Sequence, residues 1–135
     1  MNSDKPFKIM IVDDDRDDQY MIKKIVTSLA PDASIVQVYN GDECLRYLEA
    51  HAHDLPVLIT MDINMPLVNG IEAASQIKTN PAAQHIPLVV LTTSDRASDK
   101  DAALAAGAND YVVKPVIYEE LQDAVRSIVG KWLSR

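Results

Sequence analysis

The chain has 135 residues, 47% of them hydrophobic and 24% charged, a composition typical of one globular domain. Its single cysteine, Cys44, excludes an internal disulfide framework and any metal site built from several cysteines. The net charge of -7, without a cluster of Lys or Arg, argues against nucleic acid as a direct partner, because phosphate neutralisation supplies most of such affinity.

The sequence carries no targeting or membrane-spanning pattern. No apolar run approaches the roughly 20 residues that cross a bilayer, and the N-terminus lacks the basic-then-apolar order of a secretory signal. None of the four glycines belongs to a phosphate-binding loop or a dinucleotide fingerprint. We therefore expect a cytoplasmic protein that forms a single domain over residues 1–135 and has neither a nucleotide cofactor nor a membrane partner.

Short apolar runs alternate five times with segments of helical periodicity. The third run, for example, starts after Pro56 and is stopped by Pro66. In chain order we expect a strand at 8–13, a helix at 17–30, a strand at 34–39, a helix from 40, a strand at 57–61, a helix from 69, a strand at 88–92, a helix from 98 that ends at Gly107, a strand at 110–113 and a helix at 118–133.

Three of these helices have a polar residue at their expected start. Asn40 precedes Glu43 by three residues, and Asn69 precedes Glu72 by the same interval, a spacing like that of a capping box. Ser98 is expected to start the short alanine-rich helix. Such caps favour helices that begin at these positions.

The alternation of strand and helix is typical of an α/β fold, a doubly wound five-stranded parallel sheet with helices on both faces, as in flavodoxin. The strand order 2-1-3-4-5 fits five such units and places its switch point between the first and third strands. The first of these strands ends in Asp13 and Asp14, and the third ends in Asp62. Ligands bind at the carboxyl ends of such strands, so the three acids are functional candidates, although an Asp there also commonly caps a turn.

If these three carboxylates converge, like charges a few ångströms apart repel by about 4 kcal/mol per pair at the dielectric typical near protein surfaces. The group must therefore take up a proton or bind a cation. Ligation by carboxylate oxygens suits Mg²⁺, which is usually shared with a phosphate. The neighbouring acids Asp15, Asp17 and Asp18 have a structural explanation, because acids at a helix N-terminus are favoured by about 0.3–1 kcal/mol each. Whether Asp15 contacts the metal stays open.

A cation held by acids beside another carboxylate is a phosphoryl-transfer arrangement, in which Asp62 would be the nucleophile. Thr92 ends the fourth strand and offers a hydroxyl group, and Lys114 ends the fifth strand and offers a positive charge. Each alone has a simpler explanation, a turn cap for Thr92 and a solvated lysine for Lys114. Thr93 is an alternative to Thr92, although the spacing from Pro87 favours Thr92.

Four segments, VDDD at 12–15, MDINMP at 61–66, LTTSD at 91–95 and GANDYVVKP at 107–115, resemble the receiver domain of two-component response regulators. The resemblance covers essentially the whole chain. It implies that Asp62 is the phosphoacceptor and that Lys114 pairs with the phosphoryl group. It also implies that Mg²⁺ is bound by Asp13, Asp14, Asp62 and the backbone carbonyl of Asn64. Thr92 and Tyr111 would form the switch, and the peptide bond between Lys114 and Pro115 would be cis. Val116 departs from the family, in which many members have an aromatic residue after this Lys-Pro pair.

The resemblance also implies a function. The protein would accept a phosphoryl group on Asp62 from a sensor or hybrid histidine kinase, or from a phosphotransfer protein, and would signal through a change of conformation. It would not be an enzyme, apart from its own phosphorylation and dephosphorylation. The segment KTNPAAQHIPLVVLTTSD, with Asp17 and Asp18, is similar to stand-alone receivers that partner phytochrome-type kinases. Neither the downstream target nor a phosphorylation-dependent homodimer is specified.

Two other functions remain as alternatives. A small aspartyl-phosphate phosphohydrolase also uses a strand-end Asp and magnesium, but it would want a second acid where this chain has Asn64. A receiver-like scaffold that is never phosphorylated would not need the complete set of acids, hydroxyl and lysine.

Overall fold

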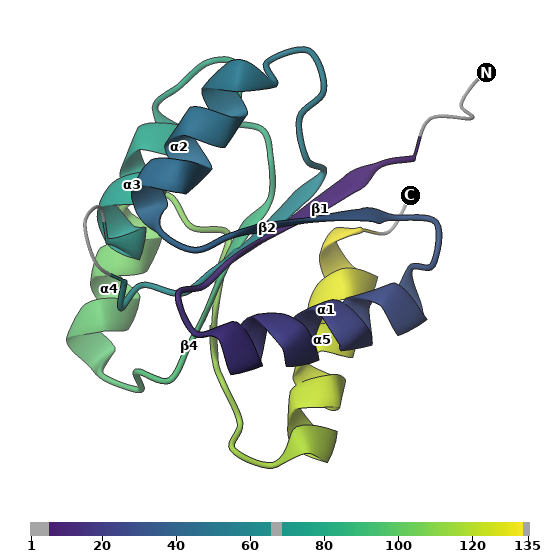
Figure 1. Cartoon of the computed structure of the whole chain (residues 1–135). Coiled ribbons are helices and arrows are strands. Elements are labelled where there is room, and N and C mark those ends of the chain that lie inside the picture. The colour runs from purple at the N-terminus through teal and green to yellow at the C-terminus, as the bar shows by residue number, and fades with distance from the viewer. Residues whose placement is uncertain (1–5, 66–68, 134–135) are drawn as a thin grey trace.

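The computed structural model describes residues 6–65 and 69–133. Five parallel strands form one sheet in the order β2-β1-β3-β4-β5, as the sequence predicts. Pro66, which was expected to stop the third strand, lies outside the described residues. Figure 1 shows the elements in their chain order: β1 (Lys8–Val12), α1 (Arg16–Leu29), β2 (Ser34–Val38), α2 (Gly41–Ala50), β3 (Leu58–Met61), α3 (Gly70–Lys78), β4 (Leu88–Thr92), α4 (Ala97–Ala105), β5 (Asp110–Val113) and α5 (Tyr118–Trp132).

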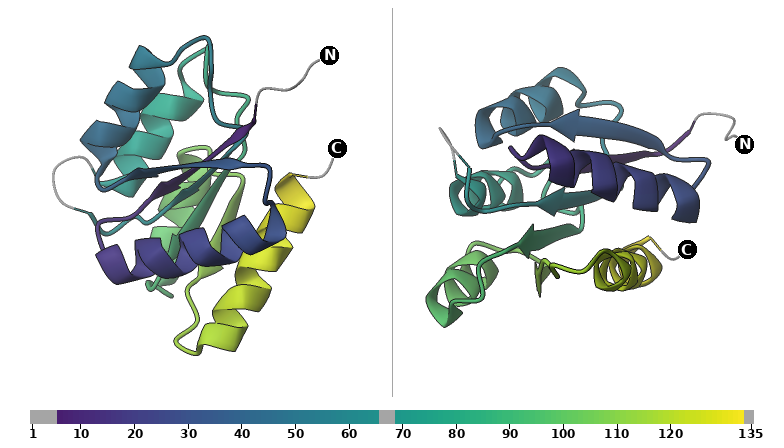
Figure 2. Two further views of the ribbon diagram at one scale, coloured as in Figure 1. Left: turned by 45° about the vertical axis from the view of Figure 1, so that its right-hand side comes forward. Right: turned by 60° about the horizontal axis from the view of Figure 1, so that its bottom comes forward.

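Helices cover both faces of the sheet. Helices α1 and α5 lie together on one face, while α2, α3 and α4 lie on the other (Figure 2). Strand β1 supplies both cores, because successive side chains of a strand point to opposite faces. Ile9 and Ile11 pack with α1 and α5, whereas Met10 and Val12 pack with α2 and α3. The central strands are therefore apolar without alternation, as expected of a sheet buried on both sides.

The register of the sheet brings the carboxyl ends of four strands to one edge. Val12 of β1 pairs with Met61 of β3, and Thr92 of β4 pairs with Val113 of β5. The residues that follow β1, β3 and β5 therefore leave the sheet from the same edge. This edge is where the sequence placed the candidate site.

Asparagine caps start α2 and α3, as the sequence predicts. Asn40 Oδ1 accepts a hydrogen bond from the Glu43 amide at 2.8 Å, and Asn69 Oδ1 accepts one from the Glu72 amide at 2.9 Å. The Glu43 carboxylate accepts from the amide of Tyr39, at 2.8 Å, so it extends the cap by one residue toward β2.

The predicted start of α4 at Ser98 is wrong. The helix starts at Ala97, and Arg96 is its N-cap residue without a side-chain capping bond. The hydroxyl group of Ser94 instead donates to Asp99 at 2.5 Å, and Arg96 also pairs with this carboxylate. The loop before α4 is therefore closed onto the first turn of the helix, which moves the helix start ahead of Ser98.

None of the helices in the described ranges 6–65 and 69–133 combines the length and apolarity needed to cross a bilayer.

Candidate functional site

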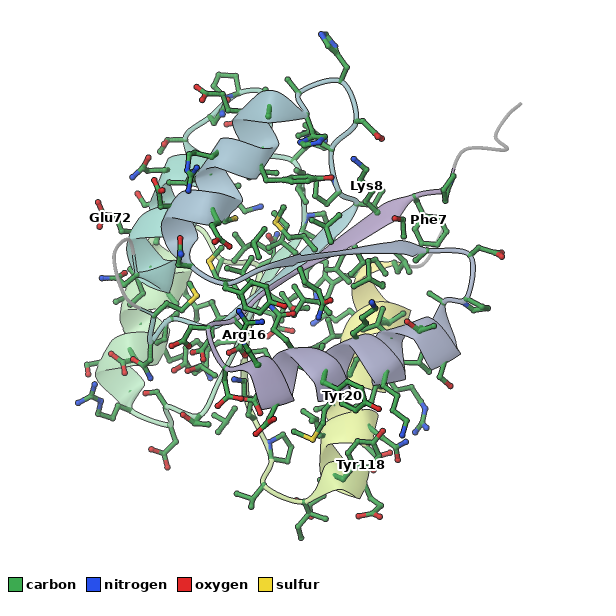
Figure 3. The ribbon with its side chains drawn as sticks, viewed as in Figure 1. Phe7, Lys8, Arg16, Tyr20, Glu72 and Tyr118 are labelled. Carbon is green, nitrogen blue, oxygen red and sulfur yellow. The ribbon has the colours of Figure 1, made fainter. Side chains whose placement is uncertain are left out.

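Three carboxylates gather where β1 and β3 end. Asp13, Asp14 and Asp62 each offer one oxygen, and these oxygens all lie within 4.8 Å of one another. The side chains of Asp13 and Asp62 are buried, whereas that of Asp14 is exposed. Oxygen-tipped side chains gather near Arg16, the first residue of α1 (Figure 3). The convergence predicted from strand order is therefore confirmed.

The ammonium group of Lys114 reaches into this group of acids from the end of β5. Its Nζ donates to Asp13 Oδ2 at 2.6 Å, to Asp18 Oδ2 at 2.8 Å and to Asp62 Oδ2 at 3.2 Å. The Lys114 amide donates to the carbonyl oxygen of Thr92 at 2.6 Å, which fixes the lysine backbone against β4. A solvated strand-end lysine is excluded, because only 6% of the side chain is exposed.

Burial and charge act in opposite directions on these groups. Burial raises the pKa of Asp13 to about 6 because it removes water from the carboxylate, and the hydrogen bond and charge of Lys114 only partly offset this effect. Burial alone would lower the pKa of Lys114. The hydrogen bonds that Lys114 donates to Asp13 and Asp18 and the surrounding negative charge outweigh burial, so the pKa of Lys114 is raised and the lysine stays protonated.

The acids at this edge fit a hard divalent cation. Carboxylate oxygens are the ligands that Mg²⁺ prefers, and a single ammonium group does not balance three carboxylates. Asp14 is exposed and faces no ion pair among the described residues, so its oxygens remain open to a cation from solvent. The residues Asp13, Asp14 and Asp62 are thus suited to hold Mg²⁺.

Asp15 has a different place. Its carboxylate accepts from the Asp18 amide at 2.9 Å and caps α1, and the Asp15 amide donates to Asp13 Oδ1 at 2.9 Å. The structural explanation of this acid is therefore correct. On the other side of the site, the Asn64 amide donates to Asp62 Oδ1 at 3.1 Å, which orients the Asp62 carboxylate. The role of the Asn64 carbonyl stays a prediction.

Of the two adjacent threonines, Thr92 is buried and Thr93 is exposed. Thr92 Oγ1 accepts a long hydrogen bond from the Ser94 amide at 3.4 Å. Tyr111 is half-buried and packs against the core on the face that α2, α3 and α4 cover. Its hydroxyl group donates to the Ser94 carbonyl oxygen at 2.8 Å. Ser94 therefore links the predicted switch hydroxyl to the predicted switch aromatic.

The cis peptide bond expected between Lys114 and Pro115 is absent, since the described residues contain no cis peptide bond. A prolyl bond favours trans by about 0.5–1 kcal/mol, so the sequence permitted a cis bond without requiring it. The trans bond still directs the Lys114 ammonium group into the site. Val116, at the position where the sequence departs from the family, is fully exposed.

Three residues of the site were missed by sequence reasoning. Asp18 was assigned to the helix N-terminus, yet it contacts Lys114. Gln19 is buried, and its Nε2 donates to the carbonyl oxygens of Ile11, Asp13 and Val38 at 2.7–3.1 Å. The only sequence signal for Gln19 was a polar residue between the apolar positions of α1.

Gly70 is the third missed residue. A Cβ atom at this position would lie 2.3 Å from the Asp62 carbonyl oxygen and 2.6 Å from Ile63 Cα. Its amide donates to the Ile63 carbonyl at 3.2 Å. The start of α3 therefore rests directly on the backbone of Asp62, and only glycine permits this approach.

A cavity of about 210 Å³ adjoins the site between α1 and the start of α5. Asp18, Lys114 and Tyr118 are among its lining residues. A larger cavity, of about 360 Å³, lies between α2 and α3, and it is lined by none of the site residues. The smaller cavity is therefore the one that belongs to the acidic edge.

The family model of the response regulator receiver domain matches residues 9–126. The chain belongs to the response regulator receiver domain family. It is similar to the probable methanogenesis regulatory protein FilR2 of Methanothrix harundinacea, with 32% identity over 98% of this chain and 88% of that protein. As a receiver domain, it is a phosphoacceptor of two-component signalling.

Two solved structures show the same receiver fold. The phosphorylated cyanobacterial phytochrome response regulator RcpA has a TM-score of 0.89 and 32% identity, over 96% of each chain. The Mn²⁺-bound form of response regulator Rcp1 has a TM-score of 0.86 and 28% identity, also over 96% of each chain. The expected doubly wound fold is therefore that of known receiver domains.

Proposed function

We propose that Asp62 is the phosphoacceptor of this receiver domain, in a Mg²⁺-dependent reaction with a histidine kinase or a phosphotransfer protein. The observation that carries this proposal is the shared ammonium group of Lys114, which lies 3.2 Å from Asp62 and 2.6 Å from Asp13. A nucleophilic carboxylate, a fixed cation and a second acid thus meet at one strand edge, which is what phosphoryl transfer requires.

The reaction follows from the side chains at this edge. A carboxylate oxygen of Asp62 attacks the phosphorus atom of a phosphohistidine, the P–N bond breaks, and the leaving imidazole keeps the electron pair and takes up a proton. Lys114 donates a hydrogen bond to a phosphoryl oxygen. Asp13, Asp14, Asp62 and the Asn64 carbonyl would hold Mg²⁺, which would supply positive charge to offset that of the phosphoryl oxygens.

The switch acts through the loop after β4. A phosphoryl group on Asp62 adds negative charge and acceptor oxygens, toward which the Thr92 hydroxyl turns. The Ser94 amide lies 3.4 Å from Thr92 Oγ1, and the Ser94 carbonyl binds the Tyr111 hydroxyl, so movement of Thr92 is passed to Tyr111. The surface of α4, β5 and α5 then changes shape, as a shift between two conformers.

The binding partners follow from this role. A sensor or hybrid histidine kinase, or a phosphotransfer protein, supplies the phosphoryl group, and a downstream protein reads the altered surface. Binding to a second phosphorylated copy of the chain, as a homodimer, is the alternative to binding a separate downstream protein. A single domain over residues 1–135 that acts in the cytoplasm is consistent with this role.

A phosphohydrolase is less well supported. Such an enzyme needs a second acid near the nucleophile to protonate a leaving group. Asn64 occupies that position, and its amide is already bonded to Asp62.

The experiment is phosphorylation by acetyl phosphate with Mg²⁺, read as intact mass. The wild-type protein should gain one phosphoryl group that hydroxylamine removes, because an acyl phosphate reacts with this nucleophile. Asp62→Asn should gain none. Labelling of Asp62→Asn at a hydroxylamine-sensitive site, or no labelling of the wild type by acetyl phosphate or by any histidine kinase, would contradict the proposal and support an unphosphorylated scaffold.

A further inference from the structure

Asp18 makes an ion pair that phosphoryl transfer to Asp62 does not require. Its Oδ2 lies 2.8 Å from Lys114 Nζ, closer than Asp62 Oδ2 at 3.2 Å. The side chain of Asp18 is 27% exposed and that of Lys114 only 6% exposed. The pair is therefore partly shielded from water, so its charges are screened less than those of a surface pair.

Asp18 also stands apart from the acids that can hold a cation. The oxygens that converge within 4.8 Å belong to Asp13, Asp14 and Asp62. A cation at these oxygens would draw on two of the three carboxylates that contact Lys114. Asp18 would then be the carboxylate that remains to bind Lys114 alone.

The ammonium group has no spare donor. A lysine carries three N–H groups, and Asp13, Asp18 and Asp62 each accept from Lys114. A phosphoryl group on Asp62 needs one of these donors. The N–H groups that Asp13 and Asp62 release when they bind a cation can pass to it, but Asp18 still holds Lys114 at 2.8 Å and neutralises part of its charge.

We propose that Asp18 is a positioning residue that competes with the phosphoryl group for Lys114 and thereby weakens the hold of the site on that group. The proposal rests on the function proposed for Asp62. Removal of the Asp18 charge weakens its hold on Lys114 and removes a negative charge near an anionic ligand. Both effects strengthen anion binding.

The backbone on either side of this pair is fixed, so the competition is between side chains. The Asp18 amide is bonded to the Asp15 carboxylate at 2.9 Å in the first turn of α1. The Lys114 amide is bonded to the Thr92 carbonyl at 2.6 Å. Both side chains line the cavity of about 210 Å³ beside Tyr118, which gives the ammonium group room to turn without disturbing the core.

The test is the affinity for beryllofluoride, a mimic of the phosphoryl group, followed by amide chemical shifts at a Mg²⁺ concentration that saturates each variant. Asp18→Asn keeps the shape of the side chain and removes its charge. Asp17→Asn is the matched control, because Asp17 is exposed in the same turn of α1. We expect Asp18→Asn to bind beryllofluoride about three- to tenfold more tightly, and Asp17→Asn to change the affinity by less than about twofold.

Each outcome decides the proposal. An affinity of Asp18→Asn that equals that of Asp17→Asn, or falls below the wild type, overturns it and assigns Asp18 to holding Lys114 in place. A wild type that binds no beryllofluoride with Mg²⁺ contradicts the proposed function instead. If Asp18→Asn does not fold, Asp18→Ala gives the same test, since alanine has a higher helix propensity.

Discussion

Lys114 Nζ and Asp13 Oδ2 are 2.6 Å apart, and both side chains are almost completely buried. They belong to residues that are 101 positions apart in the sequence. The contact joins the end of β5 to the end of β1 across the intervening strands β3 and β4. The buried pair therefore has a structural as well as a chemical role.

Replacement of Lys114 by methionine should destabilise the protein by about 3–5 kcal/mol at neutral pH without Mg²⁺, because it leaves the buried acids Asp13 and Asp62 without their counter-charge. Urea unfolding measures this loss. Lys100→Met is the control, because Lys100 is exposed on α4, and its effect should stay within about 0.5 kcal/mol. An equal loss in both variants would contradict a buried role for Lys114.

Without Mg²⁺, the free energy of unfolding should fall as the pH rises through about 6, because the folded protein then loses the proton of Asp13. Burial raises the pKa of this carboxyl above its value of 3.8 in the unfolded chain, so the folded protein binds the proton more tightly. The resulting stabilisation is complete below the unfolded pKa and is lost as the pH passes the folded pKa. Asp13→Asn should lack this dependence in urea midpoints measured across the range. A constant offset between the two proteins would contradict the raised pKa.

Mg²⁺ should raise the free energy of unfolding, by about 2.7 kcal/mol at one hundred times its dissociation constant. Asp14→Asn should reduce this gain, because an exposed carboxylate of the convergent group is lost. Asp15→Asn should keep the gain, since asparagine caps a helix as well as aspartate does and Asp15 lies outside the group. Thermal unfolding with and without Mg²⁺ measures both. Loss of the gain in Asp15→Asn would show that Asp15 contacts the metal.

Gly70→Ala should destabilise the protein and weaken phosphorylation, because its Cβ would overlap the backbone of Asp62 and Ile63. Gly130→Ala is the matched substitution, since a Cβ at that position of α5 has no neighbour within 4 Å. It should stabilise the helix by about 0.5–1 kcal/mol. Urea unfolding and acetyl phosphate labelling of both variants test the close approach. Equal behaviour of the two glycines would refute it.

Thr92→Ala should accept a phosphoryl group from acetyl phosphate but transmit it poorly, because the hydroxyl group that turns toward the phosphoryl oxygens is missing. The readout is the change in the Tyr111 ring resonances on addition of beryllofluoride and Mg²⁺. This change should be reduced in Thr92→Ala and retained in Thr93→Ala, since Thr93 is exposed. The reverse order would assign the switch to Thr93.

The architecture was predictable because each strand and helix has its own local signal. Apolar runs without alternation marked the central strands, and Asn40 and Asn69 marked two helix starts. The start of α4 was missed, because Ser94 binds Asp99 from outside the helix. No rule of local spacing reveals such a contact.

The candidate site was predictable as far as strand ends determine it. Asp13, Asp62 and Lys114 follow directly from strand order, and the structure brings them together. Asp18 and Gln19 were not predictable, since their roles depend on which turn of α1 lies above β1 and β5. The trans bond after Lys114 was also beyond the sequence, because proline permits both isomers at similar free energy.

Gln19 differs from the acids and the lysine at this edge because its side chain carries no charge. Its amide holds the carbonyl oxygens of Ile11, Asp13 and Val38, and an amide neither titrates nor attracts counter-ions. Concentrated salt therefore weakens the ion pairs of Lys114, whereas the hydrogen bonds of Gln19 keep the ends of β1 and β2 aligned. The hydrogen bonds of Gln19 are therefore insensitive to pH and ionic strength. An acidic turn transferred to another protein would need a similar buried amide to keep its conformation.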